Sequence, residues 1–163
     1  MSVILYIAMS LDGFIAGPGS DLGFLSPMEE EGEDYGYADF VKTTDTVIIG
    51  RKSYDKVISM GYDYPHTDKE VYIITHTAKP DVGTFKYYTG SLENLIAKLK
   101  NKKGKNIYLD GGSEIVNQLL SLNLVDEFII SVIPIILGDG IPLFTGSRPE
   151  LKLKLKSSRQ FEK

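Results

Sequence analysis

Apolar residues in this chain fall into six short runs, at residues 3–9, 44–50, 70–76, 84–88, 106–111 and 125–134. Most of the runs are nearly continuous in apolar side chains, which is typical of strands that are buried on both faces. Several of the segments between them repeat apolar positions at helical spacing. Strands separated by helices predict an α/β layer architecture with a mostly parallel sheet.

Four helices are predicted between these runs. Residues 29–41 begin with acidic side chains and continue with aromatic and apolar ones, which fits a helix whose first turns carry acids that favour its dipole. A second helix is predicted to begin at Arg51, directly after a run that ends in glycine. Ser91 is placed to cap a third helix that Gly104 closes, and Ser113 opens a fourth.

Three further segments have their own patterns. Residues 10–21 are rich in glycine and polar side chains, which predicts a mobile loop that is either a lid over a binding site or a surface crossover. Residues 138–144 predict an irregular crossing. Residues 151–156 alternate strictly between leucine and lysine, so we predict an edge strand with one buried face and a row of lysines in water.

Length and composition narrow the class of protein. A chain of 163 residues with 42% hydrophobic content predicts one domain, over residues 1–163. It has no cysteine, so a disulfide, a thiolate metal site and a cysteine nucleophile are excluded, and no metal site is predicted. The first apolar run ends near Met9, too short for a signal peptide or membrane span, which makes cytoplasmic residence the expectation. A net charge of −4 argues against a nucleic-acid partner.

Candidate chemistry gathers at three strand ends. They are Gly50-Arg51-Lys52-Ser53, Thr75-His76 and Gly111-Gly112-Ser113. Because the strands are predicted to be parallel, these ends should meet at one edge of the sheet, where α/β proteins bind their ligands.

Two of these ends have glycine directly before a helix start, where backbone can approach a ligand closely and free N–H groups favour an anion. Each has a simpler interpretation on its own, because the Gly111-Gly112 pair could be a tight connection and Arg51-Lys52 a solvated basic turn. A dinucleotide with an extra phosphate would use all three ends. Neither GxGxxG nor GxxxxGK[ST] occurs in the chain.

Five segments in this order carry a family resemblance: residues 8–16, 47–54, 73–75, 109–113 and 125–144. Together they resemble the dihydrofolate reductase superfamily, and within it the branch similar to the reductase domain of the bifunctional riboflavin-biosynthesis deaminase–reductase. The resemblance extends over about residues 3–156. It implies a three-layer fold in which a mostly parallel, mixed sheet is flanked by helices on both faces.

The resemblance also implies a cofactor, NADPH, and a set of residues that bind it. Backbone groups at Ala8 and Ile15 would hold the nicotinamide, and the strand end Thr75-His76 would lie beside the adenosine 2′-phosphate. The phosphate-binding turn would consist of Gly50, Arg51, Lys52 and Ser53, and the pyrophosphate loop of Gly111, Gly112, Ser113 and Glu114, with a cis bond between the two glycines.

The implied chemistry is hydride transfer to a C=N or C=O carbon of an aminopyrimidine-type or pterin-type small molecule. In dihydrofolate reductases an acid early in the helix before the Gly-Arg strand assists, and counting back from Gly50 identifies it with Asp34. Glu33 and Asp21 are the alternatives, because a gap would change the count. Ser131 would match the hydroxyl that faces this acid.

Two departures from the family pattern affect the substrate and the assembly. The chain has no tryptophan, which folate-reducing members commonly have. Family members usually continue beyond the position of Lys163 into a last antiparallel strand, so the sheet edge is either open or covered differently, and a homodimer is expected. A riboflavin-type reductase, a true dihydrofolate reductase and a non-catalytic NADPH-binding module therefore remain as alternatives.

Overall fold

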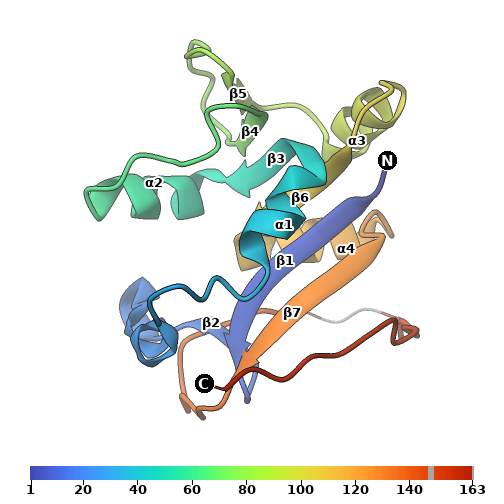
Figure 1. The fold of residues 1–163 in the computed structure, drawn as a ribbon. Helices are drawn as coiled ribbons and strands as arrows, with labels where there is room; N and C mark the ends of the chain where they lie inside the picture. Colours follow the sequence, from blue (N-terminus) through green and yellow to red (C-terminus); the bar gives the residue numbers. More distant parts are fainter. Residues whose placement is uncertain (147–148, 163) are drawn as a thin grey trace.

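The computed structural model describes residues 1–146 and 149–162 and is built on a sheet of six strands. All neighbouring strands are parallel, and their order across the sheet is β5-β4-β3-β6-β1-β7 (Figure 1). In chain order the strands are β1 Val3–Ser10, β3 Thr44–Gly50, β4 Glu70–Ile74, β5 Phe85–Tyr88, β6 Asn106–Gly111 and β7 Glu127–Ile133. These are the six predicted runs, each within two residues of its predicted ends.

Helices cover both faces of the sheet, so the three-layer α/β prediction is confirmed (Figure 1). Helices α3 (Leu92–Lys100) and α4 (Ser113–Ser121) pack their apolar sides on one face. Helices α1 (Tyr37–Lys42) and α2 (Arg51–Ser59) pack on the other face, where the core is rich in tyrosine and phenylalanine. Ser91 caps α3, because its hydroxyl accepts a hydrogen bond of 3.0 Å from the backbone N–H of Asn94.

The predicted loop over residues 10–21 contains more order than expected. Strand β2 (Phe14–Ala16) pairs antiparallel with β8 (Ile141–Pro142), which lies in the predicted irregular crossing. Two 3₁₀ helices follow, η1 (Pro18–Ser20) and η2 (Gly23–Met28). This small second sheet holds the chain after β1 against the carboxyl edge of the main sheet.

The prediction of a helix over residues 29–41 has to be corrected. Only Tyr37–Lys42 is helical, and the acidic run lies in turns before it. Gly32, Tyr35 and Gly36 have φ values of 81°, 56° and 87°, which place them in the left-handed region and are incompatible with a continuous right-handed helix.

The predicted edge strand over residues 151–156 is wrong. These residues form no ladder with any described strand, and the side chains of Leu153 and Leu155 are 66% and 81% exposed. The segment instead follows β7 as an extended tail, held there by an ion pair between Lys156 and Glu127 (Figure 1). An alternating pattern selects a face but supplies no partner strand, and without one the ladder does not form.

The helices that the structure describes are too short to span a bilayer: none is at once long and apolar enough for that role.

Candidate functional site

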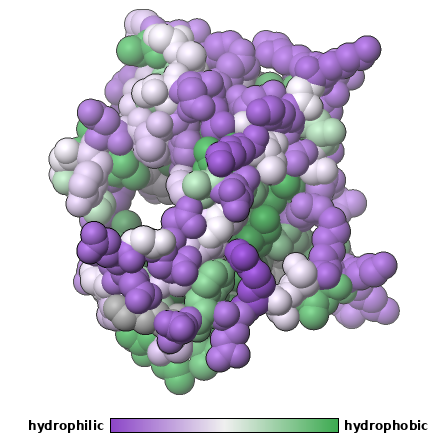
Figure 2. Space-filling view, viewed as in Figure 1, coloured by the Kyte–Doolittle hydropathy of each residue, from purple (hydrophilic) through white to green (hydrophobic). Residues whose placement is uncertain are grey.

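The carboxyl ends of β3, β4 and β6 lie side by side, as the sequence predicts. Gly50 pairs in register with Ile74, and Ile49 pairs with Gly111. A cavity of about 1080 Å³, which we call the strand-end cavity, opens above these ends. Figure 2 shows this face of the molecule hollowed beside α2, between α2 and the 3₁₀ segments of residues 18–28. The cavity is as large as the largest common small-molecule sites.

Nearly all the predicted cofactor residues meet in this cavity. Its lining includes Ala8, Ile15, Gly50, Arg51, Lys52, Ser53, Thr75, His76, Gly112, Ser113 and Glu114. Gly111 is buried directly behind Gly112 and is not part of the lining. The structure therefore brings the predicted set together, while its binding role stays a prediction.

Two helix starts approach each other at glycines. A Cβ built on Gly112 would lie 2.6 Å from the hydroxyl oxygen of Ser53, and one built on Gly50 would lie 3.0 Å from a side-chain carbon of Ile115. Neither α2 nor α4 has a side chain that caps its N-terminus, so the first N–H groups of both helices remain available at the cavity. The Gly111–Gly112 peptide is cis, as the resemblance implied.

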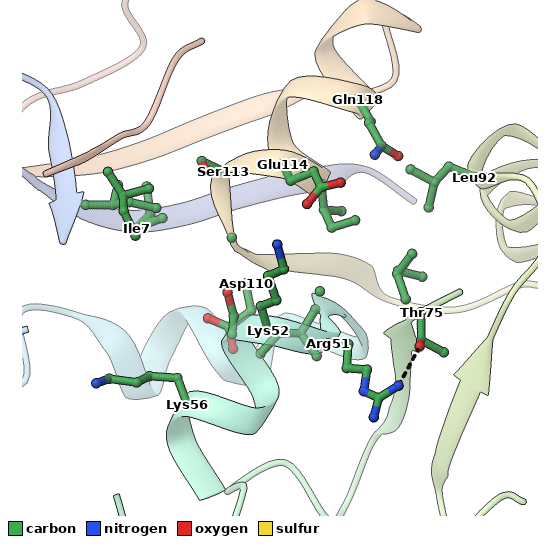
Figure 3. Close-up of a pocket in the computed structure, with 18 of the residues that line it drawn as sticks. Ile7, Arg51, Lys52, Lys56, Thr75, Leu92, Asp110, Ser113, Glu114 and Gln118 are labelled. Atoms are coloured by element: carbon green, nitrogen blue, oxygen red, sulfur yellow. Dashed lines mark hydrogen bonds between the residues drawn. The ribbon is translucent and has the colours of Figure 1, made fainter. Parts of the chain in front are cut away.

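Cations reach the cavity from α2. Arg51 Nη1 donates to Thr75 Oγ1 at 3.4 Å, and Arg51 Nε lies 3.4 Å from the carboxylate of Asp55 (Figure 3). Lys52 reaches toward the start of α4, where Glu114 lies, and Lys56 extends toward the opposite end of the site (Figure 3). Arg51 and Lys52 beside two helix N-termini, with Lys56 in the last turn of α2, favour a polyanionic ligand.

The two ends of the cavity differ in chemistry. Near β1 and β2 it is bordered by apolar side chains: Ile7, Ile15, Leu22, Leu25 and Val57. Near β4 and α3 most of the bordering residues are polar, Thr75, His76, Thr77, Thr89 and Ser91, with Ile74 and Leu92 among them. The α3 start was not among the predicted site residues, although it follows a strand end on the same edge of the sheet. An elongated ligand with phosphates in its middle and a flat ring at the apolar end fits this division.

The predicted catalytic acid, Asp34, lies outside the cavity lining. Its exposed carboxylate accepts hydrogen bonds from the backbone N–H groups of Gly36 (3.0 Å) and Ala38 (2.9 Å), which lower the pKa of the carboxyl and anchor the start of α1. The alternatives have similar local partners, because Glu33 accepts from Tyr35 N and Asp21 from Gly23 N. Each of the three carboxylates thus accepts hydrogen bonds from the backbone of a turn that precedes a helix.

Ser131 also lies outside the lining. It is half-buried on β7, where it pairs with Ala8 of β1. The structure thus brings Ser131 next to a predicted cofactor residue but not into the lining of the cavity.

Three acids line the cavity, Glu93, Asp110 and Glu114, and Asp110 is the last residue before the two glycines. Tyr64 and Tyr108 both donate hydrogen bonds to its carboxyl group, the second at 3.1 Å. Burial raises the pKa of Asp110, against the two tyrosine hydrogen bonds, which lower it. Sequence reasoning treated Asp110 as part of the glycine motif. The feature of the sequence that points to Asp110 is its charge at the end of an otherwise apolar, buried strand.

The fold and the site together define a dihydrofolate reductase-like α/β protein with a large cavity at its strand ends. More narrowly, the chain belongs to the RibD C-terminal domain family, whose sequence pattern matches residues 1–163. The Bacillus subtilis (strain 168) uncharacterized protein YwjB is 44% identical over 161 residues, which is 97% of this chain and 91% of that protein.

Solved structures agree with this assignment. A protein from Shewanella sp. PV-4, provisionally described as a riboflavin biosynthesis protein, superposes with a TM-score of 0.83 at 32% identity, over 93% of this chain and 88% of that one. The diaminohydroxyphosphoribosylaminopyrimidine deaminase/5-amino-6-(5-phosphoribosylamino)uracil reductase of Thermotoga maritima superposes with a TM-score of 0.64 at 15% identity. That match covers 95% of this chain but 51% of the other, and it shows the fold alone.

Proposed function

We propose that this protein is an NADPH-dependent reductase that acts on an aminopyrimidine of the riboflavin-biosynthesis type. The observation that carries the proposal is the strand-end cavity, where two uncapped helix starts and the cations of α2 meet between a polar and an apolar end. The family supports reduction as the reaction, and the cavity supports a phosphorylated dinucleotide as the cofactor.

Different residues of the chain would bind different parts of the cofactor. The N–H groups at Arg51 and Ser113 would receive the pyrophosphate, with Lys52 beside it. Arg51, held near Thr75, would pair with the 2′-phosphate that distinguishes NADPH from NADH. At the other end, Ala8 and Ile15 would hold the nicotinamide ring.

Bound NADPH supplies the hydride, and the protein supplies alignment, exclusion of water and a proton. The substrate would lie at the apolar end, between the nicotinamide and the α2 face that carries Lys56. Lys56 gives that end a cation, which suits a substrate with a phosphate group. The ribosylaminopyrimidine carries such a group, and the family match to riboflavin biosynthesis favours it over dihydrofolate.

Absorbance at 340 nm tests the proposal. With NADPH and 5-amino-6-(5-phosphoribosylamino)uracil, the cofactor absorbance should fall steadily. A fall with dihydrofolate, and none with the aminopyrimidine, would instead identify a dihydrofolate reductase. Tight NADPH binding with no oxidation by either substrate would leave a non-catalytic cofactor-binding module.

We also propose that two chains pair along β7, the edge strand of the sheet. No strand among the described residues pairs with its outer side, which the extended tail follows without a ladder, and Ile129 and Val132 of β7 are 40% and 51% exposed. Exposed apolar edge strands are pairing surfaces. Light scattering should give twice the 18.1 kDa of one chain, and Val132→Lys should shift the protein toward monomers. A wild-type mass of one chain would contradict the proposal.

A further inference from the structure

The last residues of the tail return to the edge of the sheet at which the strand-end cavity opens. The tail is exposed from residue 149 to Gln160, but the side chain of Phe161 is half-buried. Figure 1 shows the C-terminus beside the tip of β7, at the carboxyl edge of the parallel sheet. Burial at the far end of an exposed tail indicates that this end makes a specific contact.

That contact is with the turn that precedes α1. The ring of Phe161 packs edge-on against the ring of Tyr35, with 4.9 Å between their centroids. The guanidinium carbon of Arg159 lies 5.0 Å from the centroid of the Phe161 ring. A Cβ built on Gly36 would lie 2.6 Å from Nη2 of Arg159, so the guanidinium group occupies space that only glycine leaves open. Aromatic and cation–π contacts thus anchor residues 159–161 on this turn.

The charges on the two sides of this contact are complementary. Five of the six residues 29–34 are acidic, and the tail carries lysine at positions 152, 154 and 156 before Arg159. The pKa of Asp34 is lowered mainly by hydrogen bonds from the backbone of Ala38 and Gly36, and the charge of Arg159 adds to this effect. Charges this exposed are screened by solvent, so they attract the tail to the turn while the ring contact fixes its position.

Tyr35 connects the tail to the wall of the cavity. Its φ is 56°, in the left-handed region that bulky side chains rarely adopt, and such a residue persists only where its surroundings hold it. Its hydroxyl donates to the carbonyl of Met28 at 2.5 Å, and its N–H donates to the carboxylate of Glu33 at 2.7 Å. Its own carbonyl accepts from the hydroxyl of Tyr6 at 3.4 Å. Met28 is the last residue of η2.

The η2 segment forms one wall of the apolar end of the cavity. Leu25 within η2 and Leu22 directly before it both line the cavity, while Phe24 is buried behind them. Hydrogen bonds in a 3₁₀ segment have poorer geometry than those in an α-helix, so its position depends strongly on its neighbours. A series of contacts therefore leads from Phe161 through Tyr35 and η2 to the cavity.

We propose that residues 159–161 are a strap that fixes the η2 wall of the strand-end cavity, and that Phe161 and Tyr35 are positioning residues for the substrate. This inference rests on the proposed reductase function, in which the substrate lies at the apolar end. With the strap in place, the wall holds the substrate ring against the nicotinamide. Without it η2 moves, while the polar end of the cavity, near β4 and α3, keeps its structure.

The variant Phe161→Ala tests the strap by activity. With NADPH and 5-amino-6-(5-phosphoribosylamino)uracil, kcat/KM should fall about 10- to 100-fold, because a small misplacement of reacting groups costs rate on that order. Adenosine 2′,5′-bisphosphate, which has the 2′-phosphate but no nicotinamide, should bind the variant and the wild type equally well in calorimetry. Phe161→Tyr keeps the ring and should restore the wild-type kcat/KM.

The matched control is Leu155→Ala. Leu155 lies in the same tail, and its side chain is 81% exposed. The kcat/KM of this variant should equal that of the wild type. An equal loss in Leu155→Ala and Phe161→Ala would show that the tail acts without the ring contact, and would overturn the strap.

Amide hydrogen exchange without cofactor gives a readout that is independent of activity. The N–H of Leu25 donates to the carbonyl of Leu22, and that of Glu29 to the carbonyl of Ser26, each at 3.1 Å. In Phe161→Ala both amides should exchange about 2- to 10-fold faster, the range that an aromatic pair is worth, while β3 and β6 exchange as in the wild type. Unchanged exchange at both amides would overturn the inference. Faster exchange throughout the chain, β3 and β6 included, would also overturn it, because Phe161 would then support the whole fold.

The variant Tyr35→Phe tests the next contact in the series. It keeps the ring that Phe161 packs against and removes only the hydrogen bond to Met28. Exchange at Glu29 should be faster, as in Phe161→Ala, and the double variant should lose less kcat/KM than the two single losses combined. Independent losses that combine in full would show that Phe161 does not act through Tyr35.

The outcomes separate this inference from the proposed function. A wild-type protein that does not oxidise NADPH with the aminopyrimidine contradicts the proposed function, and the exchange experiment still decides whether the strap holds η2. A wild-type protein that turns over normally, with Phe161→Ala unchanged in both kcat/KM and exchange, overturns the inference alone. Faster exchange in η2 with an unchanged kcat/KM would reject the positioning role, because the wall would then move without affecting the substrate.

Discussion

Arg51→Ala is expected to weaken NADPH binding about 10- to 100-fold, while NADH binding changes little. Arg51 lies at the start of α2, with its guanidinium group half-buried and directed to Thr75 on the neighbouring strand end. A charge-assisted hydrogen bond to a phosphate is worth about 1.5–3 kcal/mol, and NADH lacks the phosphate that we place there. Fluorescence titration of the variant with each cofactor measures both constants.

The control for this experiment is Lys98→Ala. Lys98 is an exposed cation in the last turn of α3 and does not line the strand-end cavity, so its removal should leave both dissociation constants unchanged. If Arg51→Ala weakened NADPH and NADH equally, Arg51 would bind a group that both cofactors share, such as the pyrophosphate. If it weakened neither, the 2′-phosphate assignment would be wrong.

The position of the cavity could be predicted from the sequence because it depends on the order of strands and on where each one ends. The apolar runs that finish at Gly50, Thr75 and Gly111 needed only the parallel arrangement to meet at one edge. The glycines at two of those ends then indicated where backbone approaches most closely, and the distances around Gly50 and Gly112 agree.

The place of Asp110 in the cavity lining could not be predicted in the same way. Counting residues to Asp34 assumes that the helix before β3 begins early, but left-handed residues such as Tyr35 and Gly36 delay it. Asp34 then binds the backbone at the start of α1, where an acid favours the helix dipole. One side chain that orients Asp110 is Tyr64, which lies in an irregular segment 46 residues away. No periodic pattern in the sequence predicts that contact.

The tail after residue 149 shows a second limit. Its alternation of leucine and lysine is a good edge-strand pattern, yet Leu153 and Leu155 are exposed and no ladder forms. Whether a strand forms there depends on a partner, which a local pattern cannot specify. The same open edge of the sheet is the reason for the dimer proposal.

Gly112→Ala should impair the cofactor site through a single contact, and that contact can be relieved. The new Cβ would lie 2.6 Å from the hydroxyl oxygen of Ser53, so either this hydroxyl must rotate away or one helix start must move from the other. Overpacking of this kind costs about 1–3 kcal/mol, which corresponds to about a 10- to 100-fold loss of NADPH affinity if the displacement falls on the binding geometry. The φ of Gly112 is −80°, so alanine is not excluded by that backbone angle.

The rescue experiment decides whether the contact with Ser53 is the cause. In Gly112→Ala combined with Ser53→Ala the hydroxyl is gone, and the nearest Ser53 atom to the new Cβ is the Cβ of residue 53, at 4.0 Å, an ordinary contact. The double variant should therefore bind NADPH more tightly than Gly112→Ala alone and about as well as Ser53→Ala. Strictly additive losses in this cycle would show that the two residues do not interact and that the helix starts are not packed as the structure has them.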